Sequence, residues 1–378
     1  MKNTKFNLAT IVGTRPEIIR LSRVIPTLDK YTNHTLVHTG QNYDYELNEI
    51  FFEDLEIRKP DLYLDTPGKN TGETIGNIIQ STYEFFLKTC PDAVLILGDT
   101  NSSLAAISAK RNKIPIFHME AGNRSYDARV PEEINRKIVD HISDINLPYS
   151  DIARQYLISE GIKKDHIIKT GSPMDEVLTY YKSKILNSNI LNKLSLSSEK
   201  YFVFSCHREE NIDNHLQLQK LIDLLNYLNS EYELPIIFST HPRTRKKLEE
   251  VGYSFSEKII FSKPFSFTDY INLQLNAKAV LSDSGTITEE SSILNFPALN
   301  IRDSHERPEG FEEGSVMFTG LNLKLIKQSL EILLSQPRGK NRLLNRVSDY
   351  YSPNLSEKIV RIILSYTKYI NEVTWRKH

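Results

Sequence analysis

The sequence predicts an α/β protein made of two Rossmann-like halves, each a doubly wound parallel sheet with helices on its faces. Short apolar runs bounded by Gly, Pro, Asp or Asn alternate with amphipathic segments, which is the pattern of buried parallel strands joined by helices. The alternation stops over residues 181–200, a stretch rich in Asn, Ser and Lys, and then resumes. We therefore expect a first domain over residues 1–180, a linker over 181–200, a second domain over 201–352, and a terminal helix and tail over 353–378.

Length and composition narrow the class of protein. The 378 residues are too many for one ordinary hydrophobic core, and 39% of them are hydrophobic, which is enough to build two. The 47 basic and 48 acidic residues nearly balance, so neither nucleic acid nor an anionic membrane is the expected partner. Cys90 and Cys206 make neither a disulfide framework nor a metal-binding spacing, and no apolar stretch approaches the ~18 residues of a membrane span. We expect a cytoplasmic protein.

The expected strands are apolar runs that precede small or polar turn residues. In the first half they are Leu8–Val12, Thr35–His38, Ala93–Leu97, Ile116–His118, Ile145–Leu147 and Ile167–Thr170. In the second half they are Tyr201–Ser205, Ile236–Ser239, Lys258–Phe261, Ala279–Leu281 and Ala298–Ile301. After Ser352-Pro353, apolar residues at helical spacing predict a helix that reaches about Ile370, and Trp375–His378 is expected to be a loosely held tail.

The chemistry is expected in the stretch His118–Arg136, HMEAGNRSYDARVPEEINR, which follows a strand-like run. Loops at the carboxyl ends of strands in such sheets lie where ligands bind. Leu97–Asn101 ends another apolar strand, and its Asp99 could simply cap the helix that follows. Its position beside the first loop favours a cluster of carboxylates formed by Asp99, Glu120 and Glu132.

Gly13-Thr-Arg-Pro-Glu17 is the first of two strand-to-helix turns that could hold a phosphate. Unpaired backbone N–H groups at the start of a helix favour an anion, and Arg15 and Arg20 add positive charge. The turn has neither the Walker spacing nor the dinucleotide-binding glycine spacing. On the residues alone, a phosphate site and a plain surface turn are equally open.

Ser282–Glu290 is the second such turn. Gly285 lets a phosphate approach the backbone beside Ser284 and Thr286, and Glu290 is placed to accept hydrogen bonds from a ribose. The alternative is an ordinary helix cap followed by solvated glutamates. The pairing of two phosphate-like turns, one in each half, favours a nucleotide held across a cleft between the halves.

Two histidines also follow strands of the second half. His207 and Arg208 are expected to face the cleft, where they can hold a diphosphate oxygen. Cys206 should point to the opposite face of its strand from His207, so we interpret it as core filler and not as a nucleophile. His241 follows the next strand, and a cleft role and a structural role are equally open for it.

Taken together and in order, these motifs resemble the non-hydrolysing UDP-N-acetylglucosamine 2-epimerase family. The matching stretches are GTRPE (13–17), GDT (98–100), HMEAG (118–122), PEEINR (131–136), CHRE (206–209), SDSG with its EE (282–290) and RDSHERPE (302–309). The resemblance implies a GT-B-like arrangement of two Rossmann-like domains around a central cleft, with the C-terminal helix crossing back to the first domain. It also implies a UDP-sugar substrate, no cofactor or metal, and a homodimer.

The resemblance further implies an isomerase that inverts C2 of a UDP-linked 2-acetamido sugar. The C2 proton is removed and UDP expelled, and both then return with the proton on the opposite face. By motif, the catalytic candidates are Asp99, Glu120, Glu132 and His207. The substrate-binding candidates are Arg15, Arg20, Arg208, His241, Ser284, Gly285, Thr286, Glu290 and Arg307. Crowding of like charges is expected to raise the pKa of at least one carboxylate, and which carboxylate serves which face stays open.

Several departures from the common branch of the family bear on the substrate. They are Gly40–Tyr45, Asn123, Ser125, Thr170–Met174, and Arg20 in place of the usual Lys. These features resemble the branch that converts UDP-2-acetamido-2,6-dideoxy-L-talose to UDP-N-acetyl-L-fucosamine for capsule or O-antigen synthesis, with loss of an allosteric site as a corollary. The competing interpretations are a UDP-N-acetylglucosamine 2-epimerase, a glycosyltransferase of the same fold class, and a non-catalytic UDP-sugar sensor.

Overall fold

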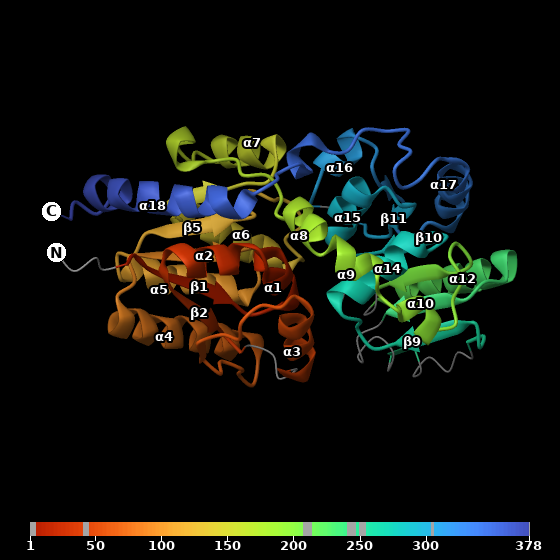
Figure 1. Ribbon diagram of the computed structural model, residues 1–378, viewed down its shortest axis with the longest axis horizontal. Helices are drawn as coiled ribbons and strands as arrows, with labels where there is room; N and C mark the ends of the chain where they lie inside the picture. Colours follow the sequence, from red (N-terminus) through yellow and green to blue (C-terminus); the bar gives the residue numbers. More distant parts are fainter. Residues whose placement is uncertain are drawn as a thin grey trace. The chain divides into compact units, whose positions relative to one another are not determined.

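The computed structural model describes residues 5–40, 45–206, 214–239, 247–248, 255–303 and 306–377 (Figure 1). The chain forms two compact units, the first made of Met1–Thr179 with Asp349–His378 and the second of Tyr180–Ser348. Each unit holds a parallel six-stranded sheet with helices, which confirms the predicted α/β class. None of the helices in the described ranges has both the length and the apolar character that crossing a bilayer requires.

The first unit has the strand order β3-β2-β1-β4-β5-β6. Its strands are β1 (Asn7–Val12), β2 (Asn33–His38), β3 (Leu62–Tyr63), β4 (Ala93–Leu97), β5 (Ile116–Met119) and β6 (Ile145–Leu147). Its helices are α1 (Arg15–Leu21), α2 (Val24–Tyr31), α3 (Tyr45–Asp54), α4 (Thr71–Thr89), η1 (Asn101–Leu104), α5 (Ala105–Arg111), α6 (Pro131–Ile142), α7 (Asp151–Ser159), η2 (Lys164–His166), α8 (Met174–Tyr180), η3 (Ser348–Tyr350) and α18 (Leu355–Val373). This doubly wound order reverses direction between β1 and β4, the point at which such sheets bind ligands.

The second unit repeats the same order as β12-β11-β10-β7-β8-β9. Its strands are β7 (Phe202–Ser205), β8 (Ile236–Ser239), β9 (Ile259–Ser262), β10 (Ala279–Ser282), β11 (Ala298–Asn300) and β12 (Met317–Phe318). Its helices are α9 (Lys182–Leu186), α10 (Ile190–Lys193), α12 (His215–Tyr232), α14 (Phe267–Asn276), α15 (Thr286–Leu294), α16 (Glu309–Glu312) and α17 (Leu323–Ser335). Here the reversal lies between β7 and β10.

Helix α18 belongs to the first unit, as predicted for the C-terminal helix. It runs beside α2, and its Ile359, Ile362 and Ile363 are buried at helical spacing (Figure 1). The expectation of a loosely held tail is wrong up to Lys377. The Lys110 ammonium lies 5.1 Å from the centre of the Trp375 ring, and Lys377 Nζ donates to the Lys113 carbonyl at 2.7 Å.

Two other local predictions differ from the structure. Residues 181–200, expected as a linker, contain α9 and α10, which both contact α14 within the second unit. The expected strand Ile167–Thr170 forms only an isolated bridge from Ile167 to Asn146. Thr170 N–H donates to the Pro148 carbonyl at 3.0 Å, but Pro148 has no N–H with which to continue a ladder.

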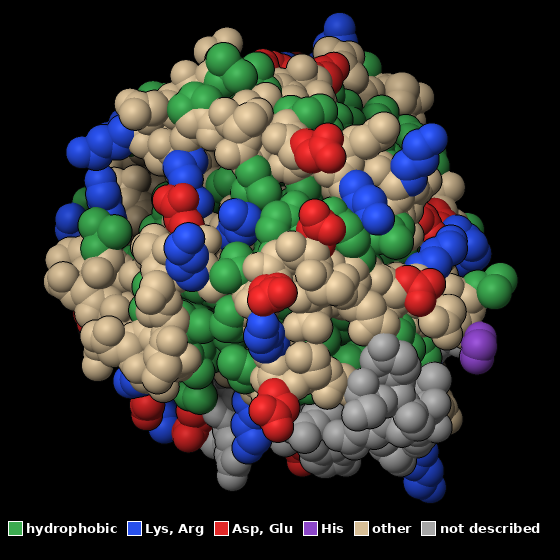
Figure 2. Space-filling model, turned by 90° about the vertical axis from the view of Figure 1, so that its right-hand side faces the viewer, with side chains coloured by type: hydrophobic (Ala, Val, Ile, Leu, Met, Phe, Trp, Pro, Cys, Tyr) green, Lys and Arg blue, Asp and Glu red, His purple; other side chains and the backbone are tan. Residues whose placement is uncertain are grey.

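On the face shown in Figure 2, acidic and basic side chains are interspersed, as the balanced composition predicts.

Candidate active site

The carboxyl edge of the first sheet brings two of the predicted catalytic carboxylates to neighbouring strand ends. β4 and β5 pair in parallel with Leu97 opposite Met119, so Asp99 and Glu120 leave adjacent strands within one residue of the same level. The chain turns through the left-handed region on both strands, at Gly98 (φ +77°) and at Glu120 (φ +64°). A non-glycine residue pays about 1–2 kcal/mol for this conformation, and such strain concentrates at functional sites.

Each of these two carboxylates faces a buried guanidinium. Arg136 donates to Asp99 Oδ2 from Nη2 at 2.6 Å and from Nε at 3.0 Å. Arg20, in the last turn of α1, donates to Glu120 Oε2 from Nη1 at 2.6 Å, and both of these side chains are under a tenth exposed. Arg20 therefore pairs with Glu120, and its predicted binding of the substrate stays a prediction. The positive charges offset the expected crowding of negative charge, and a raised pKa at one of the three predicted carboxylates stays a prediction.

Helix α6 carries the third predicted carboxylate and holds the first. Pro131 starts the helix, and Glu132 and Glu133 occupy its first turn, where the helix dipole favours negative charge. Glu132 is half-buried. One turn later, Asn135 Nδ2 donates to the Asp99 carbonyl at 3.0 Å, next to the contact of Arg136 with the same residue. The segment that presents Glu132 therefore also fixes Asp99.

The turn Gly13–Glu17 differs from the phosphate site expected there. The Glu17 carboxylate accepts the N–H groups of Gly13 and Thr14, so these donors are not available to an anion, and that part of the prediction is wrong. The Thr100 and Ser102 hydroxyls donate to the other carboxylate oxygen. Burial raises the pKa of Glu17, and these four hydrogen bonds oppose the rise. Glu17 thus joins the loops after β1 and β4.

Arg15 remains at the start of α1 and is half-buried. Its guanidinium carbon lies 5.6 Å from the centre of the Phe51 ring, which is within the range of a cation–π contact. Binding of a phosphate by Arg15 stays a prediction.

In the second unit, the turn after β10 has the geometry predicted from its sequence. Gly285 is the N-cap of α15, a helix of nine residues, and the Ser284 hydroxyl accepts the Thr286 N–H at 3.3 Å. A Cβ placed on Gly285 would lie 3.7 Å from Arg307 Nε, so the Arg307 side chain runs beside this turn. The helix start and the guanidinium favour an anion, whereas Glu306 Oε2, 3.9 Å from the same point, opposes one, so phosphate binding at this turn stays a prediction.

The glutamates of α15 are buried, so the alternative of solvated glutamates is wrong. Glu289 is fully buried and lies 3.3 Å from Arg307 Nη2. Glu290 is 5% exposed and accepts a hydrogen bond from Gln274 Nε2 of α14 at 2.8 Å. Tyr270 of α14 lies in the same group, and burial, with the charge of Glu290, raises the pKa of its phenol. The binding of a ribose by Glu290 stays a prediction.

Three predicted residues, His207, Arg208 and His241, lie outside the described residues. Cys206, which precedes them, is fully buried in the core of the second unit, and this confirms its interpretation as core filler.

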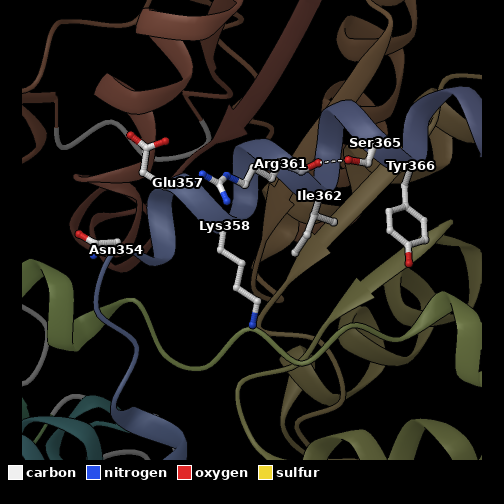
Figure 3. A pocket seen from close by; sticks show the side chains of 7 residues that line it. All are labelled: Asn354, Glu357, Lys358, Arg361, Ile362, Ser365 and Tyr366. Atoms are coloured by element: carbon white, nitrogen blue, oxygen red, sulfur yellow. Dashed lines mark hydrogen bonds between the residues drawn. The ribbon is translucent and has the colours of Figure 1, made fainter.

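A hollow beside α18 is separate from the groups above. It has a volume of about 500 Å³ and is lined by residues of α18 and its N-cap, none of which is a predicted site residue (Figure 3). Lys358, which points into this region, donates to the Lys169 carbonyl at 2.7 Å. We assign no chemistry to it.

Comparison with known proteins decides the family. Residues 27–364 match the family described as UDP-N-acetylglucosamine 2-epimerase. The chain belongs to this family. The solved structure of UDP-N-acetylglucosamine 2-epimerase from Rickettsia bellii is similar with a TM-score of 0.92 and 52% identity, over 99% of this chain and 100% of that one.

Two further relatives in the epimerase family carry different substrate names. UDP-N-acetylglucosamine 2-epimerase of Methanocaldococcus jannaschii is 37% identical over 96% of this chain and 100% of the relative. Its structure in complex with UDP-GlcNAc and UDP is similar with a TM-score of 0.87 and 33% identity, over 95% of this chain and 99% of that one. UDP-2,3-diacetamido-2,3-dideoxy-D-glucuronate 2-epimerase of Pseudomonas aeruginosa is 32% identical over 91% of this chain and 98% of the relative. The family therefore consists of UDP-sugar 2-epimerases, which are isomerases, and its members differ in the sugar.

Four side chains of the site in this epimerase were missed from the sequence. Arg136 stands in the PEEINR motif at helical spacing from Glu132 and Glu133, so its position was a signal that it shares their face. Glu17 was quoted only as part of its turn. His118 stands in the HMEAG motif, but the sequence does not indicate its pairing with Asp140 at 2.9 Å, because the two residues lie on different elements.

Proposed function

We propose that the protein inverts C2 of a UDP-linked 2-acetamido sugar by elimination and re-addition of UDP through a glycal intermediate. One observation carries the proposal: Asp99 and Glu120 leave adjacent strands at the ligand-binding edge of the first sheet, each held by a buried guanidinium. A C2 hydrogen is weakly acidic, and inversion needs a base on one face and an acid on the other. Two positioned carboxylates can act as this base and this acid. The names of the relatives support the same reaction class.

The proposal divides the remaining roles between the two units. Asp99, Glu120 and Glu132 of the first unit exchange the C2 proton. In the second unit, Ser284, Gly285, Thr286 and Arg307 bind the diphosphate, and Glu290 binds the ribose. Arg15, Arg20, His207, Arg208 and His241 complete the binding set and stabilise the charge of departing UDP. The overall reaction is redox-neutral, so no cofactor has to supply or accept electrons.

For the sugar, we infer UDP-2-acetamido-2,6-dideoxy-L-talose as substrate and UDP-N-acetyl-L-fucosamine as product. Two of the departures that suggest this branch contact carboxylates of the site. Asn123 Nδ2 donates to Glu120 Oε1 at 3.3 Å, and the N–H and hydroxyl of Ser125 each donate to Glu133 Oε2 at 3.0 Å. Residues at these positions influence how the carboxylates are held against the sugar. Action as a cytoplasmic homodimer in capsule or O-antigen synthesis is part of the same proposal.

The second candidate substrate is UDP-N-acetylglucosamine, with UDP-N-acetylmannosamine as product. It is favoured by the names of the Rickettsia bellii and Methanocaldococcus jannaschii relatives. Both candidates require the same proton transfer at C2. They differ in the configuration of the sugar and in the group at C6.

Proton NMR in deuterated water separates these alternatives. The purified protein is incubated with UDP-N-acetyl-L-fucosamine and, separately, with UDP-N-acetylglucosamine, and loss of the C2 proton signal is followed. We expect deuterium at C2 of the fucosamine compound. Exchange only with UDP-N-acetylglucosamine would replace the proposed sugar and keep the reaction. Absence of exchange with both would contradict the reaction and favour a glycosyltransferase or a sensor.

Asp99→Asn and Glu120→Gln test the residue roles within the same assay. Each substitution keeps the size of the side chain and removes its ability to take a proton. We expect exchange to be abolished and UDP affinity, measured by calorimetry, to be retained. Near-normal exchange in either variant would refute the role assigned to that carboxylate.

A further inference from the structure

His118 is a buried histidine with a carbonyl oxygen near one ring nitrogen and a carboxylate oxygen near the other. It lies in β5, and its side chain is 1% exposed. Nε2 lies 2.8 Å from the Gly98 carbonyl oxygen, and Nδ1 lies 2.9 Å from Asp140 Oδ1. The Gly98 carbonyl can only accept, so Nε2 carries a proton, and the ionised carboxylate 2.9 Å from Nδ1 favours a second proton there through its charge. The two contacts together favour an imidazolium.

A protonated His118 would place its positive charge against the buried carboxylate of Asp140. Asp140, on α6, is fully buried and also accepts from Arg124 Nη1 at 2.7 Å. Arg124 in turn makes a two-pronged contact with Glu160, at 2.7 and 2.6 Å. With Glu160, whose side chain is 24% exposed, the four groups hold two positive and two negative charges when the ring is protonated, and buried Asp140 then has a cation on each side. Burial alone would lower the pKa of His118, but the bond and charge of Asp140, with the Gly98 carbonyl and the charge of Asp99, raise it.

The contact with Gly98 determines how Asp99 leaves β4. The Gly98 N–H donates to the Met119 carbonyl at 3.0 Å, and the Gly98 carbonyl accepts from His118, so both polar groups of this residue are held by β5. The Gly98 carbonyl belongs to the peptide plane that continues into the N and Cα atoms of Asp99. With φ at +77°, Gly98 has reached a conformation that another residue adopts only with strain. Holding this one oxygen thus orients the backbone of Asp99.

We propose that His118, held by Asp140, is a positioning residue that orients the Asp99 carboxylate for proton transfer at C2. The inference rests on the proposed function, because it concerns the reaction that Asp99 performs there. Arg136 holds the Asp99 carboxylate from α6, and His118 holds the Asp99 backbone from β5. Both restraints are needed because a side chain fixed only at its tip still moves with its backbone.

Three variants separate the hydrogen bond from the charge. In His118→Asn the side chain is too short to reach the Gly98 carbonyl. In His118→Gln the amide nitrogen stands near the position of Nε2 and can donate to that carbonyl without a charge. In Asp140→Asn the amide oxygen can still accept from Arg124, while the amide N–H groups meet Nδ1 and leave a neutral ring that donates from Nε2.

Kinetics of C2 exchange and folding are measured on each variant. A displacement of a reacting group by about 1 Å costs roughly 100-fold in rate, so we expect kcat of His118→Asn to fall by about that factor. KM should change by less than about threefold, because the restraint acts on the proton transfer and not on binding. The kcat of His118→Gln should be at least about tenfold higher than that of His118→Asn. The kcat of Asp140→Asn should lie between those of His118→Gln and the wild type. His215→Gln, at an exposed position of the second unit, is the matched control and should behave as wild type.

A spectroscopic measurement tests the pair without reference to turnover. In ¹⁵N-histidine-labelled protein, the His118 ring, assigned by its loss in His118→Gln, should show two protonated nitrogens at neutral pH in the wild type. In Asp140→Asn it should show one. Wild-type kcat in a stably folded His118→Asn variant, or a single protonated nitrogen in the wild type, would overturn the inference. Absence of exchange in the wild type would refute the proposed function instead, and the ring spectrum would still report on the pair.

Discussion

Replacement of Arg136 by Met is expected to damage both the stability and the activity of the protein. The guanidinium is 2% exposed and holds Asp99 at 2.6 Å and Glu133 at 3.1 Å. Removing it leaves Glu133, which is 1% exposed, without its guanidinium, and the side chain of Asp99 is 19% exposed and thus partly hydrated. Loss of one partner from a buried ion pair costs about 3–5 kcal/mol, and the exposure of Asp99 and the remaining contact of Glu133 with Lys137 at 3.3 Å place this case near the lower value.

The expected loss of about 3 kcal/mol is measurable as a fall in melting temperature. In a domain of some 200 residues, each kcal/mol lowers Tm by about 2–4 °C, so Tm should fall on the order of 10 °C. At a temperature where the variant is folded, kcat for C2 exchange should fall roughly 100-fold because Asp99 is no longer held. Arg136→Lys should lie between Met and wild type, since one ammonium cannot span both carboxylates.

Differential scanning calorimetry and the NMR exchange assay provide the two measurements. Arg129→Met is the matched control, because Arg129 comes from the same stretch and pairs with Asp127 at 2.7 Å while 87% exposed. A surface pair of this kind contributes at most about 1 kcal/mol. The reasoning is refuted if Arg136→Met melts within about 2 °C of wild type and exchanges C2 at the wild-type rate.

Three further predictions follow from other contacts. Burial lowers the pKa of His38 from 6.5 to about 4, so the unfolded chain binds a proton at a higher pH than the folded protein does. The free energy of unfolding should therefore fall by up to roughly 3 kcal/mol as the pH drops from 6.5 towards 4. Urea unfolding should show a smaller fall for His38→Asn. Arg307→Met should destabilise the second unit by about 3 kcal/mol because it removes the guanidinium that faces buried Glu289. Calorimetry should also show weaker UDP binding, and unchanged values would contradict the buried pair. Gly171→Ala should lower Tm because the added Cβ lies 1.7 Å from Ser352 Oγ at φ +87°; a variant as stable as wild type would show that the C-terminal segment packs differently there.

Much of the fold could be predicted because the local pattern and the tertiary structure agree. β4 matches its predicted range because all five of its residues are buried, and a short apolar run has no other stable place. The helix α18 could be predicted because its apolar residues recur at helical spacing and form one stripe. The short strands β3 and β12, of two residues each, fall below the length at which alternation can be seen. Residues 181–200 look like a linker by composition, but Ile185 and Ile190 are at most 5% exposed and anchor their helices in the second unit.

The sequence by itself determined the fold class and the family, and it predicts the carboxylates Asp99, Glu120 and Glu132 as catalytic candidates, because strand ends and short motifs are properties of consecutive residues. Tertiary structure alone decided which charge each of these groups meets. The pairs Arg20 with Glu120 and His118 with Asp140 form only after helices and strands far apart in the chain have packed. The tertiary structure also decided the Gly13–Glu17 turn, where the N–H groups of Gly13 and Thr14 donate to buried Glu17 and not to a phosphate. Which side chains pair in a folded site depends on their distance in space, and the local sequence does not specify that distance.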